Sequence, residues 1–152
     1  MGWNFGDILD ALPQVMPPAA PAFIHKDRTI TWGETSRRSN NLTRAILDRG
    51  AKPGDKVAFY MRNRPEYGEA LAACFKGRLV HVNVNYRYKP DEVFYIFDDS
   101  DAQTVIYGSE FRDTIIQLKN RLSKVVAFIE INEAVAIGIA GARNCEPALR
   151  IR

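Results

Sequence analysis

A turn with the sequence Met61-Arg-Asn-Arg-Pro-Glu66 joins an apolar strand to a helix and indicates how the chain folds. The strand is expected over Lys56–Met61, where apolar and aromatic residues dominate. The helix begins at Pro65, because proline suits the first helical position, and it ends at Gly77. A second strand follows over Val80–Asn85. Together these elements form a strand–helix–strand unit, the building block of parallel sheets.

The same alternation continues along the chain. The sequence predicts a helix over Pro90–Asp99, a strand over Thr104–Tyr107, a helix over Ser109–Leu122 and a strand over Lys124–Glu130. Because parallel strands joined by single helices need right-handed crossovers, the helices must cover both faces of the sheet. We therefore expect an α/β fold, with a mostly parallel sheet of four strands and flanking helices.

The N-terminal third carries different elements. A short helix is predicted over Asn4–Leu12, and an extended connector over Pro13–Pro21, whose prolines cannot continue the helix. Two β-rich runs, Ala22–His25 and Thr29–Trp32, predict an N-terminal β-hairpin. A polar helix follows over Gly33–Asp48. We expect the hairpin and these helices at one edge of the sheet.

Composition restricts the classes of protein that the chain can form. With 152 residues it is long enough for one domain, and 46% hydrophobic residues allow a packed core. The net charge is +3, with acidic residues dispersed among the basic ones. This pattern is typical of a solvated surface and argues against a nucleic-acid partner.

Cysteine usage and the N-terminus indicate the compartment. Cys74 and Cys145 lie far apart without metal-ligand spacing, and Cys74 is expected to be a small buried hydrophobe. No apolar run approaches the roughly 18 residues needed to span a bilayer. Residues 1–10 carry acids and lack the basic leader of a secretory signal. We therefore expect a cytoplasmic protein without a transmembrane segment.

The order and spacing of five segments point to a known family. The segments are Ala22–Glu34, Gly50–Ala58, Asn63–Glu66, Tyr86–Glu92 and Ser100–Val105. Together they resemble the N-terminal region of the AMP-forming acyl-CoA synthetases, which are adenylate-forming ligases, and the resemblance covers residues 4–131. It implies an N-terminal α/β subdomain over residues 1–131 and a divergent C-terminal tail over residues 132–152. The motif Tyr86-Arg-Tyr88 suggests the fatty-acyl or bile-acid branch of the family.

Members of that family use ATP to activate a carboxylic acid as an acyl-adenylate and then transfer the acyl group to coenzyme A. The resemblance therefore implies ATP, Mg²⁺ and coenzyme A for a full-length enzyme, with a fatty acid or another carboxylic acid as substrate. The family binds the phosphates with a Gly/Ser/Thr-rich loop that ends in lysine, and this sequence contains no such loop. We assign no catalytic, cofactor-binding or metal-binding residue and expect no cofactor for this chain alone.

The expected function is that of an N-terminal fragment of an ATP-dependent fatty acyl-CoA synthetase, inactive alone because the ATP-binding loop and the C-terminal domain are absent. Its partner would be the remainder of the synthetase or a second copy of the chain. Two alternatives stay open: a stand-alone α/β module that binds a nucleotide or an acyl group, and a non-functional remnant of a truncated gene. A truncation, a frameshift and a split gene all fit the divergent tail.

A candidate substrate pocket lies in the loop formed by Asn85, Tyr86 and Arg87, because open α/β sheets bind ligands at the carboxyl ends of their strands. A plain loop contact is the competing interpretation. The preceding strand alternates valines with His81 and Asn83, whereas a central parallel strand is usually apolar on both faces. These polar groups either form a pocket wall, with His81 as a titrating group, or hydrogen-bond to neighbouring loops or to a missing part of the parent protein. We favour the second interpretation.

Two further motifs give weak signals. Asp98, Asp99 and Asp101 form an acidic cluster, but we expect a solvated turn because the ligand set is too small for Mg²⁺. Gly138 and Gly141 lack the spacing of a dinucleotide-binding loop, so we expect a helix-like or irregular tail around them.

Overall fold

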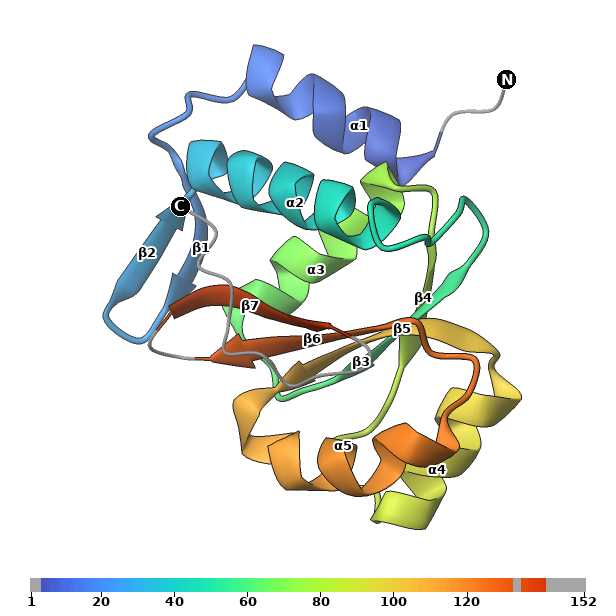
Figure 1. Cartoon of the computed structure of the whole chain (residues 1–152). Coiled ribbons are helices and arrows are strands. Elements are labelled where there is room, and N and C mark those ends of the chain that lie inside the picture. The colour runs from blue at the N-terminus through green and yellow to red at the C-terminus, as the bar shows by residue number, and fades with distance from the viewer. Residues whose placement is uncertain (1–3, 133–134, 142–152) are drawn as a thin grey trace.

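The structure is a computed structural model that describes residues 4–132 and 135–141. Its centre is a five-stranded sheet with the strand order β4-β3-β5-β6-β7 (Figure 1). The strands span Lys56–Tyr60 (β3), Val80–Asn83 (β4), Ala102–Gly108 (β5), Ala127–Asn132 (β6) and Val135–Gly141 (β7). The first four strands in this order are parallel, as the sequence predicted, and β7 is antiparallel to β6.

Strand β7 corrects the prediction for the glycine pair. Gly138 and Gly141, expected in a helix-like or irregular segment, lie in this strand, where Glu130 pairs with Gly138 and Ala127 pairs with Gly141. The physical reason is the outer edge of β6, where backbone N–H and C=O groups need hydrogen-bond partners. An antiparallel neighbour needs only a short reversal of the chain to reach them. The sheet therefore continues one strand beyond the predicted parallel set.

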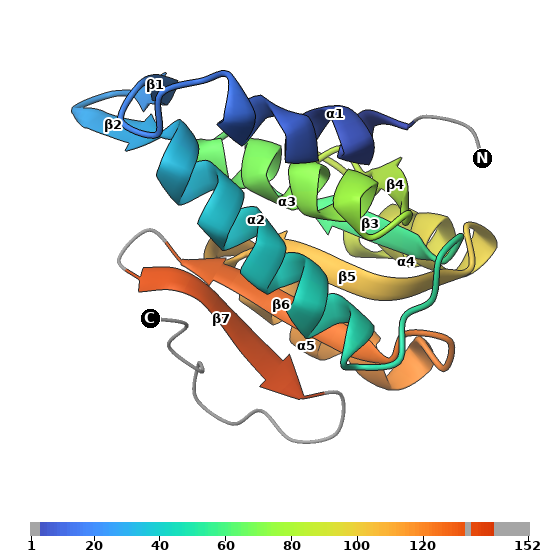
Figure 2. The ribbon, with the colours of Figure 1, turned by 90° about the horizontal axis from the view of Figure 1, so that it is seen from above.

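Helices cover both faces of the sheet, as expected. One face carries α1 (Phe5–Ala11), α2 (Trp32–Leu47) and α3 (Pro65–Lys76), and the other carries α4 (Pro90–Asp99) and α5 (Arg112–Leu118) (Figures 1 and 2). The bounds of α3 and α4 agree with the sequence prediction. The helix predicted over Ser109–Leu122 is instead a short α-helix with a 3₁₀ turn at each end, over Ser109–Phe111 and Lys119–Arg121.

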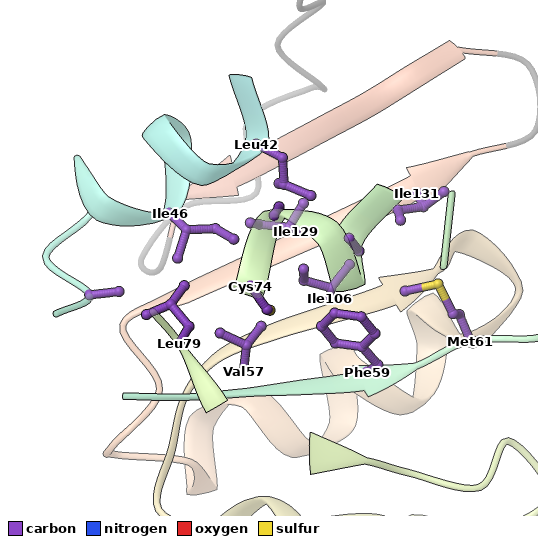
Figure 3. Packing of buried hydrophobic residues seen from close by; sticks show 13 residues of the cluster. Leu42, Ile46, Val57, Phe59, Met61, Cys74, Leu79, Ile106, Ile129 and Ile131 are labelled. Carbon is purple, nitrogen blue, oxygen red and sulfur yellow. The ribbon is translucent and has the colours of Figure 1, made fainter. Parts of the chain in front are cut away.

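The first hydrophobic core lies between the sheet and the helices α2 and α3 (Figure 3). Its fully buried side chains come from both helices and three strands and include Leu42, Ile46, Val57, Phe59, Cys74, Ile106, Ile129 and Ile131. Cys74 is the buried hydrophobe that the sequence predicted, and burial raises the pKa of its thiol to about 12. The prediction that the N-terminal helices lie at one edge is wrong, because Leu42 and Ile46 form an apolar stripe that places α2 over a face of the sheet.

The second core lies under α4 and α5. It contains Val93 and Phe97 of α4, Ile115 and Leu118 of α5, and apolar side chains of the sheet such as Val105. Spacings of four and three residues place these side chains on one face of each helix. Because helices cover both faces, the central strands β3 and β5 are buried along almost their whole length.

The N-terminal hairpin is confirmed. Strand β1 (Pro21–His25) pairs antiparallel with β2 (Arg28–Thr31). The hairpin packs against the first half of α3, where the Phe23 ring lies directly over Gly68. A Cβ at this glycine would lie 2.5 Å from the tip of the ring, so any other residue here would force the Phe23 ring to move.

The segments on either side of the hairpin differ from their predictions in detail. Trp32, expected in the second strand, begins α2 instead, because Thr31 caps this helix in a capping box with Glu34. The connector, expected to be extended, starts with a 3₁₀ turn over Leu12–Gln14. Further along, the Trp32 N–H donates to the Ala20 carbonyl at 2.9 Å. The connector therefore folds back onto the start of α2.

Candidate functional site at the carboxyl edge of the sheet

The loops that follow β3, β4 and β5 meet at one edge of the sheet. The three strands are parallel, with Phe59 paired to both Asn83 and Ile106, so their carboxyl ends point the same way. Open α/β sheets bind ligands in this position. We use the name carboxyl-edge cluster for eight polar side chains that follow these strands or lie in the second half of β6. They are Arg62 and Arg64 after β3, Asn85, Tyr86 and Arg87 after β4, Glu110 of the 3₁₀ turn and Arg112 of α5 after β5, and Glu130 of β6.

Tyr86 is the centre of one part of this cluster. The guanidinium carbons of Arg62 and Arg87 lie 4.9 Å and 5.5 Å from the centroid of its ring, within the range of cation–π contacts. The Arg87 backbone N–H donates to the Asn85 side-chain oxygen at 3.0 Å, which stabilises the turn. The structure thus places Arg62, from the loop after β3, in contact with the predicted residue Tyr86. That Asn85, Tyr86 and Arg87 line a substrate pocket stays a prediction.

Glu110 pairs with the arginines of the loop between β3 and α3. Arg64 Nη2 lies 3.1 Å from Glu110 Oε1, and Arg62 Nε lies 4.0 Å from the same oxygen. The Arg64 side chain is only 9% exposed, so this pair is partly withdrawn from water. Hydrogen bonds from arginine to a carboxylate fix the plane of the guanidinium group. Glu110 therefore orients the side chain of Arg64, the residue that joins the loop after β3 to α3.

Glu130 forms a second ion pair, with Arg112. Arg112 Nε donates to Glu130 Oε2 at 2.7 Å, and its Nη2 donates to the other oxygen, so the pair is bidentate. The Tyr107 hydroxyl also donates to Oε2, at 3.1 Å. The hydrogen bonds from Arg112 hold the pKa of Glu130 below its ordinary value, and the carboxylate raises the pKa of Arg112. Both groups are therefore charged at neutral pH.

The cluster can attract anionic groups. It contains four arginines and two glutamates, and guanidinium groups bind phosphates and carboxylates through charge-assisted hydrogen bonds. Sequence reasoning found three of its members and missed the charged ones around them. Their positions in the sequence could have revealed them, because Arg62 and Glu110 each lie two residues after the end of a parallel strand, β3 and β5 respectively.

The polar side of β4 has a structural explanation. β4 is an edge strand and not a central one, and an edge strand tolerates polar side chains. The Tyr67 hydroxyl of α3 lies 2.9 Å from His81 Nε2 and donates to Asn83 Oδ1 at 3.0 Å. Burial lowers the pKa of His81 and so favours its neutral form. The prediction that these groups are hydrogen-bonded is confirmed for His81 and Asn83, but their partner lies on α3 and not on a loop or a missing part of the protein.

The acidic cluster after α4 lies against a lysine. Lys124 Nζ lies 2.7 Å from Asp101 Oδ1 and 3.5 Å from Asp98 Oδ1, and the hydrogen bond from Lys124 lowers the pKa of Asp101. Within residues 4–132 and 135–141, no group of three or more His, Cys, Asp or Glu side chains is placed to hold a metal ion. Over the same ranges, no helix combines the length and the apolar character that crossing a membrane requires.

These features define an α/β domain whose parallel sheet presents an arginine-rich carboxyl edge. The family described as AMP-binding enzyme matches residues 13–143 of the sequence. The chain belongs to this family, and the predicted relationship to the acyl-CoA synthetases is confirmed.

Known relatives of the chain are acyl-CoA ligases. It is 33% identical over 151 residues to the 3-oxocholest-4-en-26-oate–CoA ligase of Rhodococcus rhodochrous, a match that covers 98% of this chain and 27% of the ligase. It is 35% identical over 113 residues to the feruloyl-CoA synthase of an Amycolatopsis species, covering 74% of this chain and 23% of the synthase. The chain thus spans about a quarter of the length of these relatives and corresponds to their N-terminal portion.

Solved structures share the fold. The N-terminal domain of FACL13 from Mycobacterium tuberculosis matches with a TM-score of 0.77 and 25% identity, over 88% of this chain and 34% of that one. A fatty acyl CoA synthetase from the same organism matches with a TM-score of 0.76 and 26% identity, over 84% of this chain and 26% of that one. The predicted likeness to the N-terminal subdomain of acyl-CoA ligases is confirmed.

Proposed function

We propose that the chain serves as the N-terminal scaffold of an ATP-dependent acyl-CoA ligase. The ligase would activate a fatty acid or another large hydrophobic carboxylic acid as an acyl-adenylate and transfer the acyl group to coenzyme A. The observation that carries the proposal is the family match over residues 13–143, which includes every strand of the described sheet. The relatives that act on a steroid acid and on ferulate support a large hydrophobic substrate. The cytoplasm is the expected location.

Phosphate chemistry would belong to other parts of such a ligase. Adenylation needs groups that neutralise the charge of the triphosphate. The sequence has no Gly/Ser/Thr-rich loop that ends in lysine, and the described residues contain no group of three or more His, Cys, Asp or Glu side chains placed to hold a metal ion. In our proposal this chain supplies the sheet and its carboxyl edge, and its partner is the remainder of the ligase.

Within the ligase, we place the substrate-facing wall of this chain at Asn85, Tyr86 and Arg87. The guanidinium groups of Arg62 and Arg87 flank the Tyr86 ring, so an aromatic surface and positive charge lie side by side. Such a surface suits a substrate group that is both planar and anionic, because guanidinium stacks on planar groups and pairs with anions. The wall would orient the substrate and would not itself take part in bond formation.

The hydrogen bonding of the chain argues against the alternative of a non-functional remnant. His81 and Asn83 lie on the polar side of an edge strand, where a missing partner would leave them without hydrogen bonds. Both instead bond to Tyr67 within the chain. Two clusters of buried hydrophobic residues also flank the sheet. These observations support a domain that is stable in its own right.

A chimaeric ligase tests the proposal. This chain replaces the matching N-terminal segment of the Rhodococcus rhodochrous ligase, and formation of acyl-CoA from palmitate or 3-oxocholest-4-en-26-oate is measured with ATP and coenzyme A. We expect the chimaera to form acyl-CoA and the isolated chain to release no pyrophosphate. A folded chimaera without activity would refute the scaffold role. Pyrophosphate release by the isolated chain would refute the proposal that phosphate chemistry belongs to other parts of the ligase.

The carboxyl edge is tested in the same chimaera. The double variant Arg62→Ala/Arg87→Ala removes both guanidinium groups from Tyr86, and we expect kcat/KM to fall by about tenfold, the effect of losing a charge-assisted hydrogen bond. Arg37→Ala removes an exposed arginine from α2 and serves as the matched control, with unchanged kcat/KM. Equal effects of the two substitutions would remove the carboxyl edge from the proposal.

A further inference from the structure

A small cavity lies between the N-terminal helix and the two long helices, away from the carboxyl-edge cluster. It has a volume of about 50 Å³, and its walls come from α1, the connector, the start of α2 and the second half of α3. The apolar part of the lining includes Leu9, Met16, Trp32 and Ala72. None of the lining residues belongs to the carboxyl-edge cluster, so the ligase function that we propose does not use this space.

One polar group in this lining lacks a partner. Thr35 is only 5% exposed, and its hydroxyl has no hydrogen-bond partner among the described residues. Two other hydroxyls on α2 are bonded to backbone carbonyls. Ser39 Oγ donates to the Ser36 carbonyl at 3.1 Å, and the single proton of Thr43 Oγ1 is shared between the carbonyls of Ser39 at 2.8 Å and Ala73 at 3.0 Å. Because a buried hydroxyl without a partner is costly, Thr35 marks a place where a ligand can complete the hydrogen bonding.

The charge at the cavity is already compensated. Lys76 lines one side, but its Nζ lies 2.8 Å from Asp10 Oδ1 and 2.7 Å from Asn40 Oδ1. An anionic ligand would have to compete with Asp10 for this ammonium group. The cavity therefore favours a neutral ligand, with an apolar body against Met16 and Trp32.

The size and the chemistry of the cavity argue against two simple occupants, benzene and a single water molecule. An apolar cavity of about 150 Å³ holds benzene, so a space one third as large holds only a few heavy atoms. A buried water needs about two to four polar partners, and among the fully buried side-chain oxygens and nitrogens of this lining the Thr35 hydroxyl alone lacks a hydrogen bond within the described part of the chain. We propose that the cavity binds a small neutral amphiphile, a short alkyl group that carries one hydroxyl or carbonyl, whose polar end hydrogen-bonds to Thr35. Such a ligand stabilises the folded chain by joining α1 and the connector to α2 and α3.

Amide NMR spectra of the isotope-labelled chain, titrated with 1-propanol and separately with xenon, test this proposal. We expect saturable shifts confined to the residues that line the cavity. Thr35→Val keeps the shape and removes the hydroxyl, so it should weaken 1-propanol binding about fivefold, the effect of one neutral hydrogen bond, and leave xenon binding intact. Thr35→Ser keeps the hydroxyl and should retain the binding of 1-propanol.

Two further outcomes decide the matter. Ala72→Met fills the cavity with a flexible side chain and should abolish the saturable shifts for both probes. Shifts that grow linearly with alcohol concentration, or equal affinity of the original chain and Thr35→Val for 1-propanol, would overturn the proposal. If the amide spectrum of Thr35→Val shows that this variant is unfolded, 1-propanol binding is compared between Thr35→Ser and Ala72→Met instead. Binding of 1-propanol that survives in Ala72→Met would also overturn the proposal.

Discussion

Two arginine–glutamate groups in this molecule use the same chemistry in opposite surroundings. At the carboxyl edge, Arg112 forms a bidentate pair with Glu130, and its side chain is 54% exposed. Under the hairpin, Arg38 of α2 reaches two glutamates of α3, with Nη2 2.9 Å from Glu69 Oε2 and 3.8 Å from Glu66 Oε1. The Glu69 side chain is fully buried there. The two groups thus separate the effect of pairing from the effect of burial.

The pKa values of the two groups shift in opposite directions. Hydrogen bonds from Arg112 lower the pKa of Glu130, whereas burial raises the pKa of Glu69 to about 7, despite the attraction of Arg38. Neither Glu69 oxygen has a well-directed hydrogen bond within the described part of the chain.

Glu66, the other glutamate near Arg38, differs from Glu69 in its hydrogen bonds. Glu66 borders a polar cavity of about 230 Å³ and accepts a hydrogen bond from Arg28 at 2.9 Å. Burial opposes its ionisation too, but its own backbone N–H and Arg28 keep its pKa low. An ion pair therefore keeps a carboxylate charged only where hydrogen bonds replace the lost water.

The largest effect is expected for Arg38→Met, which removes the guanidinium group 2.9 Å from the buried Glu69 carboxylate, whereas Glu66 keeps its hydrogen bond from Arg28. Removing one partner of a buried pair typically costs about 3–5 kcal/mol of unfolding free energy. Urea unfolding at pH 8 measures the loss, and Arg37→Met on the exposed side of the same helix should change stability by less than about 0.5 kcal/mol. At pH 5 the loss from Arg38→Met should be smaller, because Glu69 is then protonated. Equal losses for the two arginines would contradict the contrast between burial and exposure.

Glu69→Gln should remove a pH dependence of the stability. The pKa of Glu69 rises from 4.5 to about 7 on folding, so the folded chain binds more protons between these values and loses stability as pH rises. The contribution is fully present below pH 4.5 and is lost above about pH 7, with a total of about 3 kcal/mol. The difference in unfolding free energy between the original chain and the variant, measured at pH 5 and pH 8, isolates this group. A difference that does not change with pH would show that Glu69 titrates normally.

Tyr67→Phe tests a neutral hydrogen-bonded group of intermediate burial. The substitution deprives His81 and Asn83 of the hydroxyl that connects them, while the ring and its packing on Phe59 remain. We expect a loss of about 1 kcal/mol, since water can replace the hydroxyl at the exposed Asn83. Thermal unfolding checks the loss, and Tyr95→Phe on the exposed side of α4 is the matched control. A neutral result would mean that water satisfies both partners.

The smallest effect is expected for Glu130→Gln at the carboxyl edge. Partly exposed ion pairs contribute about 1 kcal/mol or less, and salt screens them. The pKa of Glu130 is lowered on folding, so its contribution is present above the unfolded value of 4.5 and is lost as pH falls through the folded value. The pH dependence should therefore have the opposite sign to that of Glu69. Unfolding curves at low and high salt would contradict this view if the loss stayed large and independent of salt.

Sequence reasoning succeeded where the signals are local. Pro65 and Pro90 mark the first residues of α3 and α4, and the predicted bounds of both helices agree with the structure. The four parallel strands and the hairpin also follow from apolar runs and turn residues. The helix predicted after β5 was too long, since 3₁₀ turns replace its first and last residues. Helix ends depend on tertiary packing as well as on propensity, which explains the difference.

The candidate site was predictable only in part. The rule that ligands bind at the carboxyl ends of strands pointed to Asn85, Tyr86 and Arg87, whose role in a substrate pocket stays a prediction, and the structure adds Arg62 beside Tyr86. Arg62, which contacts the Tyr86 ring, comes from the loop after β3 and lies 24 residues earlier in the chain. No local sequence pattern links these two residues. The cluster exists because β3 and β4 are neighbours in the sheet.

By itself the sequence determined the alternation of strands and helices, the apolar stripes that bury them and the membership in a family of ligases. Proline, glycine and hydrophobic periodicity act within a few residues, so these features can be read without a structure. Tertiary structure alone decided that β4 is an edge strand, that the segment after β6 adds an antiparallel strand, and that Glu69 loses its water while Glu130 keeps it. These outcomes depend on which distant segments become neighbours, because only neighbours in space can pair backbones, exclude solvent and shift a pKa.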